Sequence, residues 1–359
     1  MRKKTTPFTT PQKNKEGCSH MKQYRIGVIG AGAIAQGCHI PGYMAAKNCI
    51  LAAVADPEKK CLKMLHDNKM IFQKEYSDYR KMLKEEKLDF VSICVPNKFH
   101  AECAIAAMRA GADILLEKPI TLTLKEAMAV QRTAEKEKRR IMVGFSHRFN
   151  ELNVAAKKAL EAGKIGKPYM IRIRFAHSGP FPGWAKTDWF YNPEIAGGGA
   201  LLDMAVHAFD ISQWFLGPIT GISAKAKTLR KKIKVDDNVV ALMEFGDSCM
   251  GYVECGWTSP AGFGGIEIMG DKGLIVCDYN NNRTLLTCGC TKPDGTHENV
   301  TSILHKGKKW AWNHEIAYAV KTLASGKPFS PGIEDGIKTL KVVLAAYKSS
   351  ATGRFISLK

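Results

Sequence analysis

The sequence predicts two domains: an α/β domain built on a doubly wound parallel sheet, then an α+β domain with a large, open, mostly antiparallel sheet. Short apolar strands alternate with helical segments up to about residue 145, a glycine-rich turn follows the first strand, and several consecutive strands joined by short turns come later. The first pattern is typical of parallel βαβ units and the last of antiparallel sheets. At 359 residues and 45% hydrophobic composition, the chain is long enough for both domains.

The glycine-rich turn lies in the stretch 24–36, YRIGVIGAGAIAQ. Its β-branched run predicts a strand that stops at Gly30, with a helical segment beginning shortly afterwards. In such a turn Gly30 allows the tight bend, Gly32 lets a phosphate approach the helix N-terminus, and Ala35 lets the helix pack closely. We therefore expect a dinucleotide-binding Rossmann domain, whose contacts here are Gly30, Gly32, Ala33 and Ile34. Small residues also crowd ordinary strand–helix corners, which is the alternative interpretation.

The alternation on either side of this turn gives the motif the context it needs. The predicted strands of the first domain are 25–29, 49–55, 90–95, 113–116 and 141–145. The predicted helices are 34–46, 59–69, 79–86, 101–110 and 124–138. The second strand ends at Asp56, where an acid accepts hydrogen bonds from the adenosine ribose and repels a 2′-phosphate. Asp56 thus favours NAD over NADP, although a helix cap is its other possible role.

The pattern changes after residue 144, where strands follow one another. We predict strands over 167–177, 221–229, 239–245, 249–257, 265–269, 273–278 and 283–287. A helix over 199–216 interrupts them, and two helices, 313–325 and 334–350, close the chain. The boundaries are 1–21 for a disordered basic tail or sequence upstream of the true start, 22–145 and 146–310 for the two domains, and 311–359 for the closing helices.

The net charge of +19 raises the possibility of nucleic-acid binding. Several basic residues lie in the tail, however, and others alternate with acids on helical faces. The only dense basic patch in the body of the chain is 230–234, RKKIK, and no nucleic-acid-binding module accompanies it. A solvated Lys-rich surface explains the charge better, so we expect no nucleic-acid partner.

Location is indicated by what the sequence lacks. No apolar run approaches the roughly 18–20 residues of a membrane span, and the basic tail has no apolar region of the kind a secretory signal carries. Eleven cysteines are scattered without C-x-x-C pairs, which favours free thiols in a reducing compartment. We expect a cytoplasmic protein without membrane contact.

Two motifs carry candidate chemistry. The fourth strand ends in Glu117-Lys118-Pro119, which projects from the carboxyl edge of the sheet where such folds bind ligands. Three glycines, 197–199, precede a helix that carries Asp203 and His207 four residues apart, on one face. The glycines would let backbone approach a ligand. A metal at Asp203 and His207 would need a third ligand, so we expect none; a purely structural Asp–His pair remains the other alternative.

These motifs together resemble the Gfo/Idh/MocA oxidoreductases, a family that includes glucose–fructose oxidoreductase and inositol 2-dehydrogenase. The glycine-rich turn, Glu-Lys-Pro and Gly-Gly-Gly…Asp…His occur in the family's order over nearly all of 21–359. The stretches 95–100, VPNKFH, and 143–150, VGFSHRFN, fit the resemblance as well.

The resemblance implies a Rossmann domain, an α/β domain whose open sheet serves substrate binding and assembly into a homodimer or homotetramer, and closing helices that pack back on the first domain. It implies NAD as cofactor and oxidation of a secondary alcohol of a sugar or cyclitol, or reduction of the ketone. The further cofactor contacts are Pro96, Asn97, His100, Glu117 and Lys118. The catalytic residues are Lys118, Asp203 and His207.

The roles follow from the residue types. A histidine near neutrality suits removal of the hydroxyl proton, so His207 is the expected general base. Lys118 would stabilise the alkoxide-like oxygen and Asp203 would bind an adjacent hydroxyl. How Lys118 and His207 divide proton transfer is left open.

The aromatic stretch 180–192 is a candidate substrate loop, with Trp184 to stack on a sugar and Asn192 to bind hydroxyls. A satellite hydrophobic cluster is the alternative. His177 and Arg148 are further substrate-side candidates.

Two other functions remain open on this scaffold. One is a glycosidase or eliminase that recycles tightly held NAD internally. The other is a non-enzymatic sensor of nucleotide or sugar, which the presence of all three catalytic residues argues against.

Overall fold

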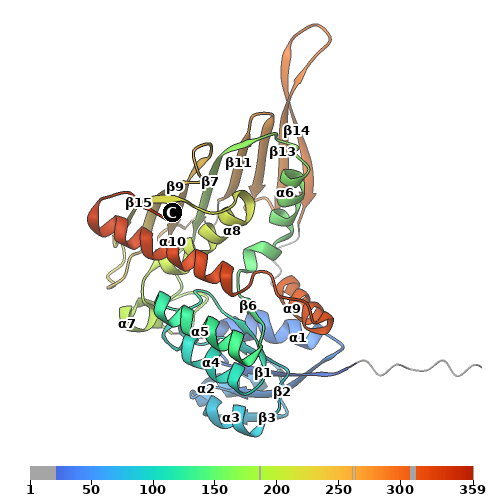
Figure 1. The fold of residues 1–359 in the computed structure, drawn as a ribbon, viewed down its shortest axis with the longest axis vertical. Coiled ribbons are helices and arrows are strands. Elements are labelled where there is room, and N and C mark those ends of the chain that lie inside the picture. Colours follow the sequence, from blue (N-terminus) through green and yellow to red (C-terminus); the bar gives the residue numbers. More distant parts are fainter. Residues whose placement is uncertain (1–21, 186, 261, 263, 308–312, 359) are drawn as a thin grey trace, which may run out of the picture.

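The computed structural model describes residues 22–185, 187–260, 262, 264–307 and 313–358. The predicted tail, 1–21, lies outside the described residues. Two sheets organise the chain, one in the lower and one in the upper half of Figure 1. The predicted fold class is confirmed, because one sheet is parallel and the other is mostly antiparallel.

The first sheet has six parallel strands in the order β3-β2-β1-β4-β5-β6. Its strands are β1 (Tyr24–Ile29), β2 (Cys49–Ala55), β3 (Lys74–Tyr76), β4 (Phe90–Ile93), β5 (Asp113–Leu116) and β6 (Ile141–Val143). Its helices are α1 (Ile40–Ala45), α2 (Lys59–Asp67), α3 (Tyr79–Glu85), α4 (His100–Arg109) and α5 (Leu124–Glu137). The strand order reverses between β1 and β4, and ligands bind at the carboxyl ends of strands beside such a switch point.

The second sheet has nine strands in the order β14-β13-β12-β11-β7-β10-β9-β8-β15, of which only β7 and β10 pair in parallel. The strands from β7 to β10 are β7 (Pro168–Ala176), β8 (Gly221–Lys227), β9 (Asn238–Glu244) and β10 (Met250–Gly256). The later strands are β11 (Gly265–Gly270), β12 (Gly273–Asp278), β13 (Arg283–Thr291), β14 (His297–Lys306) and β15 (Ile356–Ser357). The last pair, β13 and β14, projects beyond the rest of the sheet (Figure 1).

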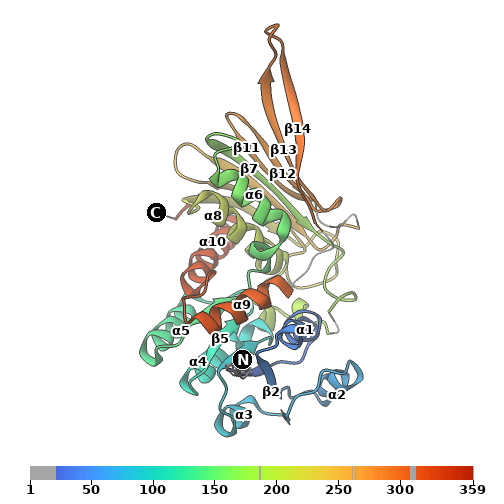
Figure 2. The ribbon, with the colours of Figure 1, turned by 90° about the vertical axis from the view of Figure 1, so that its right-hand side faces the viewer.

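Helices α6 (Glu151–Glu161), α8 (Val206–Leu216) and α10 (Ile333–Thr352) lie on one side of this sheet (Figure 2). The short helix α7 (Pro193–Ala196) precedes α8. Alternate residues of β7, such as Ile171, Ile173 and Phe175, are buried on the helical side. On the other side Val240 and Leu242 of β9 are each 53% exposed, so this face of the sheet is open.

The two closing helices divide between the domains. Helix α9 (Asn313–Ser325) packs on α1, and its Ile316 and Leu323 complete a core cluster with Tyr24 and Phe90 of the first sheet. Helix α10 packs on β8 and α8 and also reaches α5 and β6. The closing segment therefore contacts both domains rather than the first alone.

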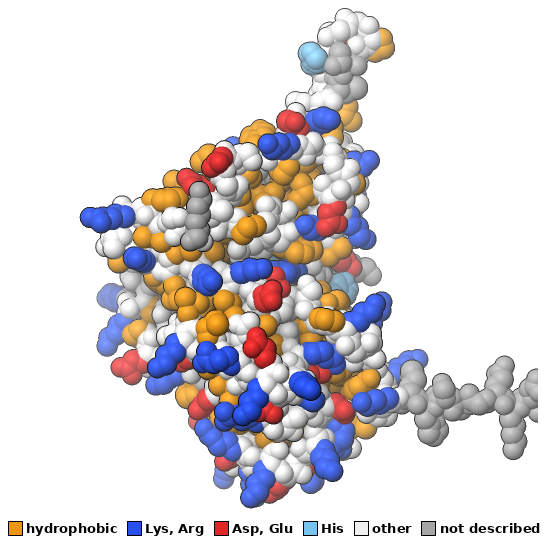
Figure 3. Space-filling view, viewed as in Figure 1, with side chains coloured by type: hydrophobic (Ala, Val, Ile, Leu, Met, Phe, Trp, Pro, Cys, Tyr) orange, Lys and Arg blue, Asp and Glu red, His pale blue; other side chains and the backbone are white. Residues whose placement is uncertain are grey.

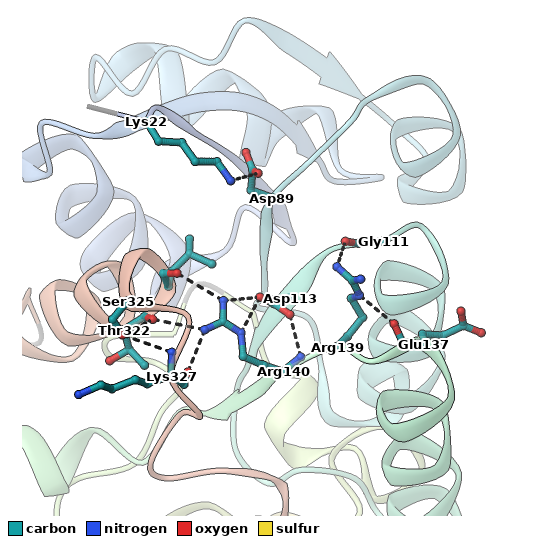
Figure 4. A network of polar contacts seen from close by, with 11 residues as sticks. Lys22, Asp89, Gly111, Asp113, Glu137, Arg139, Arg140, Thr322, Ser325 and Lys327 are labelled. Carbon is teal, nitrogen blue, oxygen red and sulfur yellow. Dashed lines mark hydrogen bonds and ion pairs between the residues drawn. The ribbon is translucent and has the colours of Figure 1, made fainter. Parts of the chain in front are cut away.

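Arg140, just before β6, fastens the end of α9 to the parallel sheet (Figure 4). Its guanidinium donates to Asp113 Oδ2 at 2.6 and 2.9 Å and to the carbonyl of Lys327 at 2.8 Å. The same group lies over the Phe329 ring, 5.0 Å from its centroid. The partly buried Arg140 guanidinium thus joins the first sheet to the closing segment.

The surface charges match the sequence-based interpretation. Figure 3 shows Lys and Arg side chains spread over the viewed face, interspersed with Asp and Glu. No helix among the described residues is long and apolar enough to cross a membrane. The cysteines whose side chains are described are free thiols, and Cys94, Cys103, Cys255 and Cys277 are buried.

Candidate active site at the carboxyl edge of the parallel sheet

The glycine-rich turn leaves space beside the backbone at the end of β1. Gly30 has φ +90°, and a Cβ there would lie 2.4 Å from the carbonyl oxygen of Cys94. Only glycine fits this bend. A Cβ at Gly32 would meet no atom within 4 Å, so the chain faces open space there. Ala33 and Ile34 begin the helical segment, which continues as a π-helical turn, Ala35–His39, before α1. These features fit the approach of a pyrophosphate.

Asp56 lies at the tip of β2, against this turn. Its Oδ2 accepts the N–H of Ala31 at 2.7 Å and its Oδ1 accepts the N–H of Glu58 at 2.8 Å. Burial raises the pKa of Asp56, although these two hydrogen bonds oppose the shift. The carboxylate therefore braces the glycine-rich turn and joins it to Glu58, the residue at the N-cap position of α2. Asp56 is not the N-cap of that helix, and its contact with a ribose stays a prediction.

Glu117, at the end of β5, belongs to a buried polar network beneath this edge. Its Oε1 lies 2.9 Å from Nε2 of His39, whose Nδ1 lies 3.0 Å from Ser92 Oγ. Tyr43 joins the same hydroxyl at 2.6 Å. Burial would raise the pKa of Glu117, but the His39 hydrogen bond and nearby positive charges leave it below its ordinary value. A charged Glu117 held by His39 is a fixed support for the residue that follows it.

A second buried carboxyl faces this network from α9. Glu315 is 2% exposed, and its Oε1 has no hydrogen-bond partner among the described residues. Burial, followed by the negative charge of Glu117, raises the pKa of Glu315 well above its ordinary value. The protonated form is therefore favoured at Glu315 and the ionised form at Glu117. Sequence reasoning missed His39 and Glu315, because neither residue belongs to a motif.

The loop after β4 holds the backbone around the site. The Asn97 side chain donates to the Ala196 carbonyl at 2.8 Å, and Pro96 precedes it at the start of a short 3₁₀ turn. The two ring nitrogens of His100 lie 2.6 Å from the Pro119 carbonyl oxygen and 3.0 Å from that of Val95. His100 is buried and spans two loops, so its ring positions backbone.

Lys118 and Asp203 meet across the boundary between the domains. Lys118 Nζ donates to Asp203 Oδ1 at 2.6 Å and to the Asp203 carbonyl at 3.1 Å. The Lys118–Pro119 peptide bond is cis. The indole N–H of the fully buried Trp257 donates to the other carboxylate oxygen of Asp203 at 3.2 Å. Both oxygens of Asp203 are therefore held, and the ammonium has a fixed place. Trp257 has no motif around it and was not predicted.

Three glycines, 197–199, precede the helical segment that carries Asp203 and His207, and two of them lie against other parts of the chain. A Cβ at Gly199 would lie 1.8 Å from the carbonyl oxygen of Asp236, and one at Gly198 would overlap the Tyr347 hydroxyl. The Asp236 carboxylate accepts the N–H groups of Gly199 and Leu201 at 3.0 and 2.7 Å. Gly198 and Gly199 therefore admit α10 and a neighbouring loop, whereas the approach of this backbone to a ligand stays a prediction.

His207 is close to Lys118 but does not bond to Asp203. Asp203 lies in a π-helical turn, Leu201–Ala205, and His207 lies in the α-helix that follows. The His207 ring packs on that of His147 with centroids 4.7 Å apart, and its Nδ1 is buried without a partner among the described residues. Burial, and then the charge of Lys118, lowers the pKa of His207 well below its ordinary value. Burial and the neighbouring Lys118 charge therefore favour the neutral form of the imidazole.

Of the four substrate candidates, His177 interacts electrostatically with Lys118 and Asp203 of this centre. Its Nδ1 accepts the N–H of Gly179 at 2.8 Å, and its pKa is lowered first by burial while Asp203, Lys118 and Lys231 act on it electrostatically. Trp184 lies on the aromatic loop and is 47% exposed. Its ring packs on that of Phe190, with the ring centroids 5.1 Å apart.

Arg148 and Asn192 have structural partners instead. Arg148 is buried between two acids, donating to Asp210 at 2.6 and 2.8 Å and to Asp335 at 3.0 Å. This guanidinium joins α8 to α10. The Asn192 side chain accepts the N–H of Glu194 at 2.9 Å and caps α7. Neither side chain is presented to a substrate by these contacts.

His147 is a site residue that the sequence reasoning missed. It lies beside Arg148 in the motif but, unlike Arg148, its ring contacts His207 and Phe175. Burial lowers the pKa of His147 to about 3. Among the described residues, no group of three or more His, Cys, Asp or Glu side chains is arranged to hold a metal ion.

Family models match both domains of this chain. Residues 24–145 match the oxidoreductase family with an NAD-binding Rossmann fold, and residues 153–276 match the GFO/IDH/MocA C-terminal domain. Myo-inositol 2-dehydrogenase of Thermotoga maritima is 27% identical over 341 residues, which cover 93% of this chain and 98% of that protein. Scyllo-inositol 2-dehydrogenase (NAD(+)) of Bacillus subtilis is 29% identical over 364 residues, covering 94% and 96%.

Solved structures share the fold over the same extent. Levoglucosan dehydrogenase in complex with NADH and levoglucosan superposes with a TM-score of 0.83 at 24% identity, covering 94% of this chain and 100% of that one. Aldose–aldose oxidoreductase from Caulobacter crescentus, complexed with glycerol, gives 0.80 at 20% identity over 94% and 100%.

Proposed function

Because this chain belongs to the Gfo/Idh/MocA family of NAD-binding oxidoreductases, we propose that it transfers a hydride between NAD and a secondary alcohol or ketone. The substrate class is a sugar, a sugar derivative or a cyclitol such as an inositol. The observation that carries the proposal is the Lys118 ammonium, fixed on Asp203 at 2.6 Å beside the neutral His207. This pair lies where the carboxyl end of β5 meets the second domain.

The first domain provides the binding residues for the cofactor. Gly30 and Gly32 leave room for the pyrophosphate, Ala33 and Ile34 supply the start of the helical segment, and Asp56 faces the ribose position. Glu117 stays ionised on His39 and supports the backbone next to Lys118. The loop that follows β4 is held in place by Pro96, Asn97 and His100. NAD supplies the hydride acceptor or donor when it is bound.

Lys118 of the first domain and residues of the second domain together handle the alcohol. Lys118 Nζ donates a hydrogen bond to the reacting oxygen and stabilises the negative charge that develops there. His207, which is neutral, takes the hydroxyl proton at a ring nitrogen during oxidation and returns it during reduction. Asp203 holds Lys118 in place and accepts a hydrogen bond from an adjacent hydroxyl of the substrate. His177 and Trp184 complete the substrate side.

The open face of the second sheet is the proposed interface between copies of the chain. Leu242 of β9 lies opposite Tyr252 of β10, and Val240 and Met250 lie on the same face opposite Glu254 and Glu244. The four apolar side chains are between 39% and 53% exposed. An apolar sheet face of this kind is typical of a protein–protein contact. We propose a homodimer or homotetramer formed through it, and sedimentation analysis measures which of them forms; a monomer would contradict the proposal.

A panel of inositols, aldoses and glycosides tested with NAD and with NADP is the direct experiment. We expect NADH absorbance to rise with at least one polyol, and NAD to work better than NADP. The Lys118→Met variant is the control for contaminating dehydrogenases. Consumption of a glycoside without released NADH would instead indicate internal recycling of the cofactor, and polyol binding without any turnover would indicate a sensor.

A further inference from the structure

The basic stretch 230–234 belongs to a loop that runs from the end of β8 to the start of β9 and lies beside the proposed active site. Both ends of the loop are fixed. Asp237 accepts the N–H groups of Leu229, Arg230 and Lys231 at 2.7, 2.9 and 2.7 Å. Asp236 binds the backbone at the start of the segment that carries Asp203. The loop therefore has a defined position relative to Lys118 and Asp203.

Lys231 extends from this loop toward the substrate side. A Cβ added to Gly179 would lie 2.8 Å from Lys231 Cε, 2.9 Å from its Nζ and 3.2 Å from the Tyr191 hydroxyl. Gly179 has φ +106° and donates its N–H to His177 Nδ1. The Lys231 ammonium therefore packs beside a residue that is hydrogen-bonded to this imidazole. The charges of Lys118, Asp203 and Lys231 all act on His177. The Lys231 side chain thus places a second ammonium group, besides that of Lys118, on the substrate side of the proposed active site.

Lys231 differs from Lys118 in having no anionic partner. No carboxylate of the described residues lies within 4 Å of its ammonium, although the side chain is partly buried. The nearby acids are already engaged: Asp203 by Lys118 and Trp257, and Asp237 by backbone N–H groups. The Lys231 ammonium therefore keeps its hydrogen-bond donors available for an anion, to which charge-assisted hydrogen bonds are strong.

We propose that the substrate carries an anionic group, a carboxylate or a phosphate, and that the Lys231 ammonium binds it. The inference rests on the proposed function, because it assigns the class of alcohol: a sugar acid or a sugar phosphate rather than a neutral polyol. The carbinol lies at Lys118 and the anionic group lies across His177 from it. Lys231 is then a specificity-determining residue and takes no part in hydride transfer.

The test compares matched substrates in wild-type protein and in Lys231→Met. Each set contains a neutral aldose, its uronate and its 6-phosphate, with NADH formation as the readout. We expect kcat/KM for one anionic member to exceed that for the neutral sugar, and to fall about 10- to 100-fold in Lys231→Met, as for one lost charge-assisted hydrogen bond. The neutral sugar should change by less than about two-fold. The uronate and phosphate arms identify which anion is bound.

Two further variants separate specificity from folding. Lys231→Arg keeps the charge and should retain most of the preference. Lys232→Met removes an exposed charge from the same loop and should behave as wild type. The inference is overturned if wild type shows no preference for either anion, or if Lys231→Met and Lys232→Met behave alike, or if the neutral sugar loses as much as its anionic partner.

A binding measurement distinguishes failure of this inference from failure of the proposed function. Quenching or enhancement of NADH fluorescence in the protein–NADH complex reports sugar binding without turnover. Binding of a uronate or phosphate that depends on Lys231, with no oxidation of any sugar, would retain the anion site and reject the dehydrogenase. Oxidation of neutral polyols, together with anion binding that does not change in Lys231→Met, would support the dehydrogenase and reject the anion site.

Discussion

The two sides of the proposed active site differ in how their polar groups are satisfied. On the cofactor side, Asp56 is held by two backbone N–H groups and Glu117 by His39. On the substrate side, His207 has an unpartnered buried nitrogen and Lys231 has no counter-ion among the described residues. Asp56 and Glu117 on the cofactor side are thus held before anything binds, although Glu315 Oε1 behind Glu117 has no partner among the described residues, whereas His207 and Lys231 on the substrate side keep unused hydrogen-bonding capacity. A preorganised cofactor side suits a cofactor that many enzymes share, and unused hydrogen-bonding groups on the substrate side suit recognition of a particular substrate.

Removing Lys118 should produce the largest effect, because it lies where the two sides meet. We expect Lys118→Met to lower kcat by about 100- to 1,000-fold or more, as for loss of a group that stabilises a developing oxyanion. NAD binding, followed by its fluorescence signal, should persist because the glycine-rich turn is untouched. The exposed Lys125→Met is the matched control. Normal turnover in Lys118→Met would contradict the mechanism.

The Asp56→Ala variant tests whether this carboxylate contributes to NAD binding on the cofactor side. Asp56→Ala should raise the KM for NAD by about ten-fold, since a hydrogen bond to a charged group is lost, and should narrow the preference for NAD over NADP. Sugar KM should change little. Asp78→Ala removes a helix-capping carboxylate of the same domain and serves as control. An unchanged NAD/NADP ratio would mean that Asp56 acts only as a brace for the turn.

The substrate-side histidines predict a loss of stability in acid. Burial lowers the pKa of His147 to about 3 and lowers that of His207 as well, so the unfolded chain binds more protons than the folded one below about pH 6.5. Stability is therefore retained above that pH, and each buried histidine removes up to about 1.4 kcal/mol for each pH unit below it. Urea unfolding between about pH 6 and 5 measures the slope.

The variant His147→Phe should reduce this slope by about 1.4 kcal/mol per pH unit. A slope in His147→Phe equal to that of wild type would show that His147 is already protonated in the folded protein.

The sequence predicted those parts of the molecule that repeat a local pattern. Apolar strands alternating with helices predicted the parallel sheet, and all of its strands except the short, partly exposed β3 were expected. Strand β14 was missed because its side chains are exposed on both faces, which removes the alternation that marks a strand. Helix α6 was also missed, although the cap at Asn150 and the spacing of Leu152, Ala156 and Ala159 were available signals.

The site was predicted where chemistry sits in a motif and missed where it depends on distant partners. Lys118 and Asp203 were named from motifs, and the structure brings them together. Arg148 was misread as a substrate ligand because its partners, Asp210 and Asp335, are 62 and 187 residues away. The same reason hid the role of Lys231, which seemed part of a solvated basic run until the fold placed it near His177. Tertiary contacts of this length leave no local trace in a sequence.

The position of α9 has a consequence for the order in which the protein is made. Tyr24 and Phe90 belong to strands synthesised early, yet their cluster is completed by Ile316, Leu323 and Phe329. A ribosome must therefore deliver nearly the whole chain before the nucleotide-binding domain can close its core, even though that domain is first in the sequence. Until then an apolar surface of this domain stays uncovered, and nascent chains with such surfaces are the ones that chaperones retain.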